Sequence, residues 1–298
     1  MEYRLRSLLA HVIFRIWPTD IGLETLMQVL NPPPLPGTTR TIQLKGYSLT
    51  FEYRPNSYMG RFLSYRRMYE EGPLRTLRHI LRPGDAFLDA GANAGLYTVI
   101  AAHLVGPSGV VLACEPQNGV SSLLRANVIA NGLANVQIHL VAIGRTPGRA
   151  FLYQPAPNND GEASLALKPG EEATAPPPQP VTVSTVALLL QQASLAGLRC
   201  MKIDVEGAEL EVLSGTSPFL TPTTIPYILW EGIDRHLVRF DATLEQVWQI
   251  FWSNGYQVLC HSRGRWHPIR TRRDHDAARR SGDFLSVSAS APLPSWLR

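Results

Sequence analysis

The chain has 298 residues, of which 45% are apolar and 17% are charged, so it can bury a substantial core and is unlike a disordered protein. Its three cysteines, Cys114, Cys200 and Cys260, are too few and too scattered for a disulfide scaffold or a zinc cluster. No apolar run approaches the ~20 residues of a membrane-spanning helix. We therefore expect a cytoplasmic protein without a transmembrane segment.

Arginine carries nearly all of the positive charge, because the chain has only three lysines and a net charge of +4. Seven arginines lie between residues 263 and 280, inside an expected loop over 261–282. Arginine binds carboxylate or phosphate through paired hydrogen bonds, so this loop indicates either an anionic acceptor or a plain solvated segment. So small a net charge does not indicate nucleic acid, and no such partner is expected.

Residues 1–30 are expected to form one or two amphipathic helices, because apolar side chains recur at helical spacing between Leu5 and Trp17. Their apolar face could pack against the main domain, against a partner subunit of a homo-oligomer, or on a membrane surface contacted through residues 1–17. The proline-rich residues 31–37 then read as a linker. We assign this helical extension to residues 1–40 and one larger domain to residues 41–298.

The larger domain is expected to begin with a short hairpin over residues 41–53, and from residue 74 short apolar strands alternate with helices. Strands separated by helices predict a mostly parallel sheet covered on both faces, with its core over about 74–288. Residues 154–180 are rich in proline and glycine and are expected to form a flap. The expected strands are 85–89, 109–114, 135–141, 199–203, 225–230, 255–260 and 283–288, and the expected helices lie near 95–104, 118–131, 207–214 and 241–253.

A glycine-containing loop with acids at both ends is the first candidate site. The sequence Asp89-Ala-Gly-Ala-Asn-Ala-Gly95 follows an expected strand and opens a helix, so its glycines let the backbone turn tightly and approach a ligand. Glu115 ends the next strand, where its carboxylate can accept both hydroxyls of an adenosine ribose. Pro116 suits the first turn of the helix that follows. These residues predict a cofactor that contains adenosine.

The charge of Asp89 separates two such cofactors. A nicotinamide cofactor carries a pyrophosphate, which a carboxylate ~4 Å away would repel by ~1–4 kcal/mol. The glycine spacing also departs from the G-x-G-x-x-G pattern of that class. S-adenosylmethionine carries an adenosine, a sulfonium and an ammonium group, and it has no phosphate. We therefore expect S-adenosylmethionine as the cofactor.

Three segments together resemble the FkbM-type S-adenosylmethionine-dependent methyltransferases: residues 89–98, Glu115-Pro116 and residues 202–209. The resemblance covers roughly residues 69–231. It implies the Rossmann-like α/β fold of class I methyltransferases, with a mostly parallel seven-stranded sheet, helices on both faces and an antiparallel last strand. It also implies O-methylation of a hydroxyl on a sugar, a glycan or lipid head group, or a natural product.

The resemblance further implies which side chains surround the cofactor. Residues 158–164 match a family segment that lies over the cofactor cleft, although a plain turn fits the same residues. Tyr69 and Glu70 match a position that closes over the cofactor. The implied cofactor site consists of Asp89, Gly91, Asn93, Gly95, Tyr97, Glu115, Pro116 and Ala142.

Carboxylates also follow the next two core strands. Asp204 ends an expected strand, and in the implied fold this position faces the transferable methyl group. Asp204, with Glu206 or Glu231, is expected to align the acceptor hydroxyl and remove its proton. Glu206 and Glu209 also have a structural explanation, because a helix dipole favours acids in the first turn. Lys202 is expected to be a buried ion-pair partner of one of these acids.

A metal ion is the alternative use of these carboxylates. Asp204 and Glu231 end neighbouring strands and could together hold a divalent ion. No histidine accompanies them at a metal-binding spacing, so we do not expect a metal site. His236, His261 and His267 are alternative bases, although isolated histidines are more often structural.

The sequence therefore predicts a methyltransferase that acts on the hydroxyl of a small-molecule or carbohydrate-like acceptor. Two other classes of protein stay open. One is a non-catalytic module that retains the nucleotide-binding fold, and the other is a NAD-dependent oxidoreductase.

Overall fold

The structure is a computed structural model. It describes residues 12–13, 37–66, 69–154, 161, 163–167, 170, 177–270, 274, 276, 282–290 and 297. Of the helices expected within residues 1–30, only Val12 and Ile13 are described, and both are helical. Most of the expected flap and four of the seven clustered arginines lie outside the described residues.

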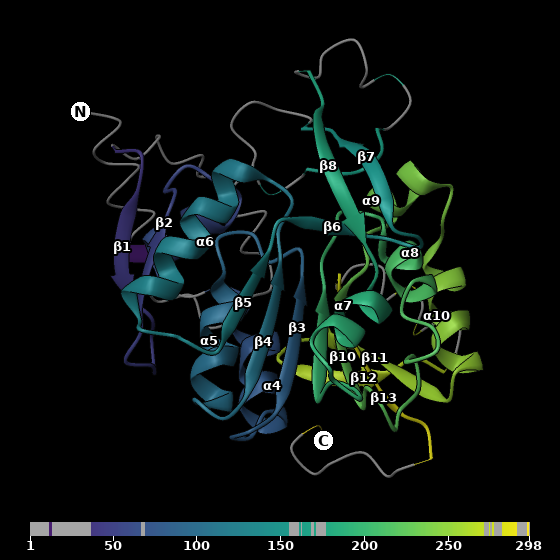
Figure 1. The fold of residues 1–298 in the computed structure, drawn as a ribbon. Helices are drawn as coiled ribbons and strands as arrows, with labels where there is room; N and C mark the ends of the chain where they lie inside the picture. The colour runs from purple at the N-terminus through teal and green to yellow at the C-terminus, as the bar shows by residue number, and fades with distance from the viewer. Residues whose placement is uncertain are drawn as a thin grey trace.

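The central sheet has eight strands in the order β12-β11-β13-β10-β9-β3-β4-β5 (Figure 1). β13 lies antiparallel between β10 and β11, while β5, β4, β3, β9 and β10 are parallel neighbours. This order confirms the predicted mostly parallel α/β sheet with its antiparallel last strand. The strands are β3 (Ala86–Ala90), β4 (Val110–Cys114), β5 (Val136–His139), β9 (Cys200–Ile203), β10 (Tyr227–Glu231), β11 (Tyr256–Ser262), β12 (Arg265–Pro268) and β13 (Asp283–Ser288).

Side chains of each core strand alternate between two apolar clusters, as the two-residue period of a strand requires. Phe87 of β3 packs with one cluster, and its neighbour Leu88 packs with the other. The first cluster contains residues of α4 (Glu71–Ile80), α5 (Leu96–Val105) and α6 (Asn118–Ala130). The second contains residues of α7 (Val186–Gln192), α8 (Glu209–Ser214) and α10 (Leu244–Ser253). Helices therefore cover both faces of the sheet.

Three expectations about the core elements were wrong in detail. The sheet has an eighth strand, because β12 forms a hairpin with β11 inside the expected loop 261–282. The turn of this hairpin uses Arg263 and Gly264 with positive φ angles of 52° and 77°. The expected strand 135–141 ends at His139, and the chain then enters a different sheet. The expected helix 241–253 begins at Leu244, where Thr243 and Gln246 form a capping box.

A second, three-stranded sheet was not predicted. It consists of β6 (Val141–Ile143), β8 (Gln179–Ser184) and β7 (Gly148–Leu152), in that order. In Figure 1 this sheet projects beyond the end of the central sheet. The remaining described elements are the hairpin β1 (Arg40–Gln43) and β2 (Thr50–Tyr53), the helices α3 (Tyr58–Arg66) and α9 (Asp234–Leu237), and the short helix η2 (Val238–Phe240).

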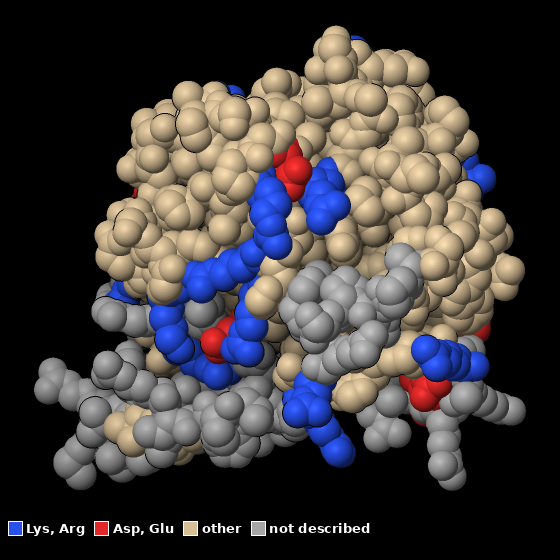
Figure 2. Space-filling model, turned by 90° about the horizontal axis from the view of Figure 1, so that it is seen from below, with Lys and Arg blue, Asp and Glu red and all other residues tan. Residues whose placement is uncertain are grey.

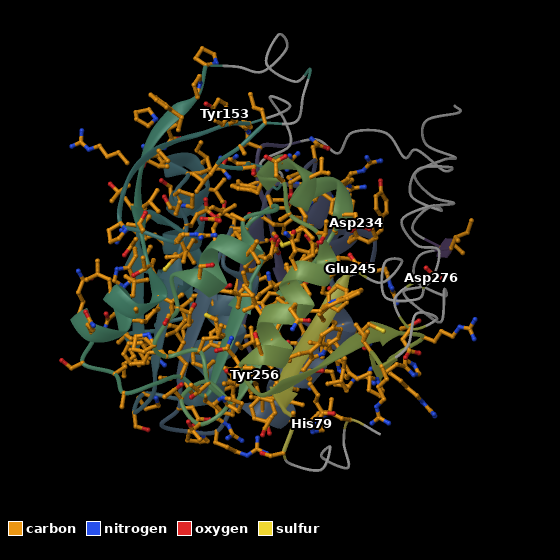
Figure 3. The ribbon with its side chains drawn as sticks, turned by 90° about the vertical axis from the view of Figure 1, so that its right-hand side faces the viewer. His79, Tyr153, Asp234, Glu245, Tyr256 and Asp276 are labelled. Carbon is orange, nitrogen blue, oxygen red and sulfur yellow. The ribbon has the colours of Figure 1, made fainter. Side chains whose placement is uncertain are left out.

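Charged side chains gather at one end of the molecule, near the amino ends of the parallel strands (Figure 2). Tyr153, which follows β7, lies at one end of the molecule in Figure 3, whereas Tyr256 and His79 lie toward the other. Figure 2 shows the face seen from below Figure 1, where basic side chains gather beside a few acidic ones. Ion pairs near the amino ends of the strands include Arg199 with Asp85 at 3.9 Å. All three cysteines are buried and free, and no described helix is long and apolar enough to cross a membrane.

Candidate active site

The loop after β3 takes a conformation that its glycines allow. Gly91 and Gly95 have φ angles of 83° and 90°, and Asn93 between them has a φ of 51°. A Cβ added at Gly91 would overlap the backbone oxygen of Asp204, so this glycine lets two loops meet. The Asn93 side chain accepts a hydrogen bond from the backbone N–H of Ala94 at 2.7 Å. The loop is therefore held in one shape at the carboxyl end of the sheet.

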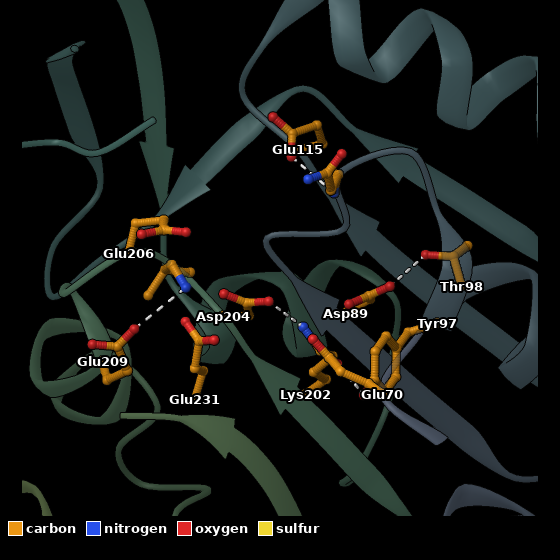
Figure 4. Close-up of polar contacts among 12 residues, drawn as sticks. Glu70, Asp89, Tyr97, Thr98, Glu115, Lys202, Asp204, Glu206, Glu209 and Glu231 are labelled. Atoms are coloured by element: carbon orange, nitrogen blue, oxygen red, sulfur yellow. Dashed lines mark hydrogen bonds and ion pairs between the residues drawn. The ribbon is translucent and has the colours of Figure 1, made fainter. Parts of the chain in front are cut away.

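Glu115 lies at the end of β4 and faces this loop (Figure 4). Its two carboxylate oxygens accept hydrogen bonds from the backbone N–H groups of Asn93 and Gln117, each at 2.9 Å. The residue is only 4% exposed, and burial raises the pKa of its carboxyl to about 7 despite these bonds. A buried, oriented carboxylate of this kind can accept hydrogen bonds from ligand hydroxyls.

Asp89 lies in β3 below the loop and is 1% exposed. One carboxylate oxygen accepts a hydrogen bond from the Thr98 hydroxyl at 2.6 Å. The other is buried without a hydrogen-bond partner among the described residues. Burial raises the pKa of this carboxyl, and the nearby Lys202 ammonium partly offsets the rise. Asp89 therefore keeps one buried carboxylate oxygen without a hydrogen bond from the described residues, beside the loop that follows β3.

A cavity opens in front of the loop, with about 580 Å³ of empty space that is continuous with the solvent. Five of the residues predicted to bind the cofactor line it: Gly91, Asn93, Glu115, Pro116 and Ala142. Asp89, Gly95 and Tyr97 are not among its lining residues. Gly95 instead packs against Leu124 at the start of α5. Leu152, Gly161, Ala163 and Leu165 form another part of the cavity wall, and Asp204, Val205, Glu206 and Ala208 line its remaining side.

The flap contacts the side of this cavity formed by Asp204, Val205, Glu206 and Ala208 through Ser164. Ser164 is 1% exposed, and its hydroxyl donates to the backbone oxygen of Glu206 at 2.9 Å. It also forms an isolated β-bridge with Tyr153. The expected Asn158 and Asn159 lie outside the described residues. Ser164 thus holds the described part of the flap beside Glu206.

Lys202 and Asp204 form an ion pair at the end of β9, as the sequence predicted for Lys202. The Lys202 ammonium lies 2.7 Å from an Asp204 carboxylate oxygen and 4.5 Å from the centre of the Tyr97 ring. Glu70, whose backbone has a left-handed φ of 48°, accepts a hydrogen bond from the Tyr97 hydroxyl at 2.5 Å. Burial lowers the pKa of Lys202, but the carboxylates of Asp204, Glu70 and Asp89 together outweigh this effect and raise it above its usual value. Lys202 is therefore a buried, charged side chain that contacts both Asp204 and the Tyr97 ring.

A second, smaller pocket of about 260 Å³ adjoins the first, and Asp204 lines both. Tyr97 and Glu231 line this second pocket rather than the first, so the structure places Tyr97 away from the expected cofactor site. Glu70 likewise lines the second pocket. The full lining is Glu70, Pro73, Tyr97, Lys202, Asp204, Leu229, Trp230, Glu231, Asp283 and Phe284.

Glu231 at the end of β10 is surrounded by like charges. It is paired across the sheet with Asp283 of β13. Burial and the neighbouring carboxylates of Asp204 and Glu206 raise its pKa well above the usual value. Directly opposed acids destabilise a strand pair, so this arrangement is costly to the fold. A carboxyl with a raised pKa is better suited to accept a proton near neutral pH.

His236 brings a third group to this cluster. Its Nδ1 lies 2.9 Å from a Glu206 carboxylate oxygen and 4.0 Å from one of Glu231. Glu206 has a left-handed φ of 56°, and Arg239 approaches the same carboxylate at 3.7 Å. Sequence reasoning treated His236 as one of three isolated histidines and did not consider Arg239. Both lie on the short segment α9–η2, which has no periodic pattern to reveal it.

Glu206, Glu231 and His236 have ligand atoms within 4.8 Å of one another and could hold a metal ion. Two arginines argue against it. Arg235 donates to Nε2 of His236 at 3.1 Å, which leaves the proton on Nδ1, and a protonated Nδ1 cannot bind a metal. Arg239 already supplies positive charge beside Glu206. The described geometry is therefore that of an ion-pair network.

Glu209 has the structural role that the helix position indicated. It is 3% exposed, and one carboxylate oxygen accepts from the backbone N–H of Gly207 at 3.2 Å and of Val205 at 3.4 Å. Burial raises the pKa of its carboxyl to about 8. Glu209 lines neither pocket, and it braces the loop that carries Asp204 and Glu206.

Comparison with known proteins agrees with this architecture. The methyltransferase FkbM domain model matches residues 89–258. The chain is 30% identical over 165 residues to the 31-O-demethyl-FK506 methyltransferase FkbM of Streptomyces tacrolimicus, covering 47% of this chain and 63% of that protein. It is 28% identical over 148 residues to Methyltransferase 1 of Beauveria bassiana, covering 45% of this chain and 59% of that protein. The chain thus spans about three fifths of these relatives.

Among solved structures, the crystal structure of methyltransferase FkbM from Methylobacillus flagellatus is similar with a TM-score of 0.41 and 13% identity. The similarity covers 95% of this chain and 59% of that one. The strand order of the central sheet and the cavity at its carboxyl end define a class I methyltransferase fold. The family match extends over more than half of the chain. This protein belongs to the FkbM methyltransferase family.

Proposed function

We propose that this protein is an S-adenosylmethionine-dependent O-methyltransferase. Its acceptor is a hydroxyl on a sugar, on a glycan or lipid head group, or on a natural product. The observation that carries the proposal is the meeting of two pockets at Asp204. One pocket has the glycine loop and the polar groups that suit the cofactor, and the other has the carboxylates that an acceptor hydroxyl requires.

The chemistry of the larger pocket fits S-adenosylmethionine. Glu115 offers a buried carboxylate to the ribose hydroxyls, and Gly91 and Asn93 shape the loop beneath the ligand. The carboxylates of Asp204 and Glu206 line this pocket and suit a ligand with cationic groups, whereas Asp89 is buried beneath the loop. A pyrophosphate would be repelled by the same carboxylates. The charge of the site therefore favours this cofactor over a nicotinamide dinucleotide.

When bound, S-adenosylmethionine supplies an electrophilic methyl group. Asp204, held by Lys202, lies where the two pockets meet and orients the acceptor hydroxyl toward that methyl group. Glu231 lines the same pocket as Asp204 and, in its ionised form, accepts the proton that the hydroxyl loses. Glu206 is held by His236 and Arg239 and completes the negative wall of the cleft.

The charges of the smaller pocket also narrow the class of acceptor. Glu70, Asp204, Glu231 and Asp283 face one basic residue, Lys202, among its lining residues. Carboxylates accept hydrogen bonds from hydroxyls and repel anions. We therefore favour a neutral, hydroxyl-rich acceptor over the anionic one that the arginine-rich segment indicated. None of the described arginines of that segment lines either pocket.

We also propose residues 41–298 as the methyltransferase domain. The hairpin β1–β2 supports this start, because Phe51 and Tyr53 of β2 are buried in the same apolar cluster as α5. The helical extension before it stays a prediction, as do its contact with a membrane surface and a homo-oligomeric state.

Turnover of S-adenosylmethionine to S-adenosylhomocysteine with a panel of sugars and polyhydroxylated natural products tests the proposal. Asp204→Asn is expected to retain cofactor binding and lose turnover by about 100-fold or more, the usual contribution of a positioned acid or base. Asp241→Asn, at an exposed site outside both pockets, is the matched control. Unchanged turnover in Asp204→Asn would contradict the assigned role. Cofactor binding without turnover on any acceptor would favour a non-catalytic module.

A further inference from the structure

Two asparagine side chains, Asn127 of α6 and Asn131 at the C-cap of α6, complete the outer edge of β2. β2 pairs with β1 on one side only. On its other side, the Asn131 amide accepts from the backbone N–H of Thr50 at 2.8 Å and donates to the Thr50 oxygen at 2.7 Å. Asn127, one helical turn earlier, does the same for Glu52 at 2.6 Å and 2.8 Å. The two amides thus take the place of a neighbouring strand and satisfy an otherwise open edge.

The two asparagines differ in their third hydrogen bond. Asn131 donates to the backbone oxygen of Asn127 in its own helix, at 2.8 Å. Asn127 donates instead to the backbone oxygen of Ala94 in the cofactor loop, at 2.9 Å. Asn127 is 1% exposed, so this bond is made out of contact with water. One buried side chain therefore joins the hairpin, α6 and the cofactor loop.

Ala94 occupies the part of the loop that most needs an external support. Its neighbours Asn93 and Gly95 both have positive φ angles, of 51° and 90°. Asn93 lines the cofactor cavity and donates its backbone N–H to Glu115. A positive φ at a residue other than glycine costs energy, and it persists only where the surroundings hold it. The bond from Asn127 fixes the Ala94 carbonyl between these two residues.

We propose that Asn127 is a positioning residue for cofactor binding: it holds the Ala94 carbonyl, and with it Asn93 and the Glu115 carboxylate, in the binding geometry. This inference rests on the proposed function, because it needs the cavity to bind S-adenosylmethionine or its product. It assigns to α6 and the β1–β2 hairpin a role in the cofactor site, although neither lines the cavity.

Asn127→Ala and Asn131→Ala form a matched pair, because each removes three hydrogen bonds and two of the three are to β2. The full-length variants are titrated calorimetrically with S-adenosylhomocysteine well below their melting temperatures. We expect Asn127→Ala to raise the dissociation constant about tenfold and Asn131→Ala to change it by less than about twofold. Both variants are expected to melt at lower temperature than the wild type.

Equal affinity of Asn127→Ala and the wild type would overturn the inference. An equal loss in both variants would also overturn it, since the hairpin and not the loop contact would then be responsible. If Asn127→Ala does not fold, Asn127→Asp replaces it, because the carboxyl keeps the acceptor for the Glu52 N–H and loses the amide donors to the Glu52 and Ala94 oxygens. A folded wild type that fails to bind S-adenosylhomocysteine would instead refute the proposed function, and the inference with it.

Discussion

Replacing Lys202 by methionine tests whether the buried charges of the site depend on this ammonium. Lys202 is 2.7 Å from Asp204, with side chains 8% and 26% exposed respectively. Removing one partner of a buried ion pair costs about 3–5 kcal/mol. Because Asp204 retains some contact with water, we expect the lower end of this range, about 3 kcal/mol, at pH 7.5. Lys45→Met, at an exposed turn, is the control and is expected to change stability by less than about 0.5 kcal/mol.

The loss should also depend on pH. Burial already raises the pKa values of Glu70 and Asp89, and Lys202 lowers both. Without Lys202 these pKa values rise further above those of the unfolded chain. A carboxyl whose folded pKa is raised destabilises the fold at high pH, and this cost is relieved as the pH falls through the folded pKa. We therefore expect Lys202→Met to lose less stability at pH 5.5 than at pH 7.5, and urea unfolding at the two pH values measures both losses. A loss below about 1 kcal/mol, or an equal loss at both pH values, would refute the reasoning.

Three further predictions concern the cofactor cavity. Gly91→Ala is expected to abolish S-adenosylhomocysteine binding, because its Cβ would overlap Asp204, whereas Gly132→Ala meets no atom and should cost only about 1–2 kcal/mol of stability, measured by urea unfolding. The affinity for S-adenosylhomocysteine should rise as the pH increases through about 7, where Glu115 ionises. Calorimetry should show that this affinity depends less on pH in Glu115→Gln. Exhaustive chelation of metal ions should leave turnover unchanged, because Arg239 and the Nδ1 proton of His236 already neutralise the Glu206 carboxylate. Loss of activity that Mn²⁺ restores would contradict this prediction.

The central sheet was predictable because its strands are short apolar runs between helices. β3, β4 and β9 are almost entirely buried, and apart from Asp89 and Lys202 their residues are apolar. The three-stranded sheet carried no such signal. β6 has only three residues, and β8 contains Pro180, which argues against a central strand. β12 was hidden in a segment whose arginines indicated a loop.

The site residues that could be predicted from the sequence are those at the carboxyl ends of the parallel strands. Glu115 and Asp204 follow β4 and β9, Glu231 is the last residue of β10, and parallel strands bring their carboxyl ends to one edge of the sheet. The partners of these acids come from elsewhere in the chain. Glu70 precedes α4, and His236 lies on a helix of four residues, so their proximity depends on packing that no local pattern encodes. Only the family resemblance drew attention to Glu70.

The most direct test of the central claim is a calorimetric titration of the wild-type protein with S-adenosylhomocysteine, with Glu115→Ala and NADH as controls. We predict micromolar binding to the wild type, at least a tenfold loss in Glu115→Ala, in which the carboxylate is removed from the cavity, and no binding of NADH. A folded wild type that binds NADH, or that does not bind S-adenosylhomocysteine, would contradict the account.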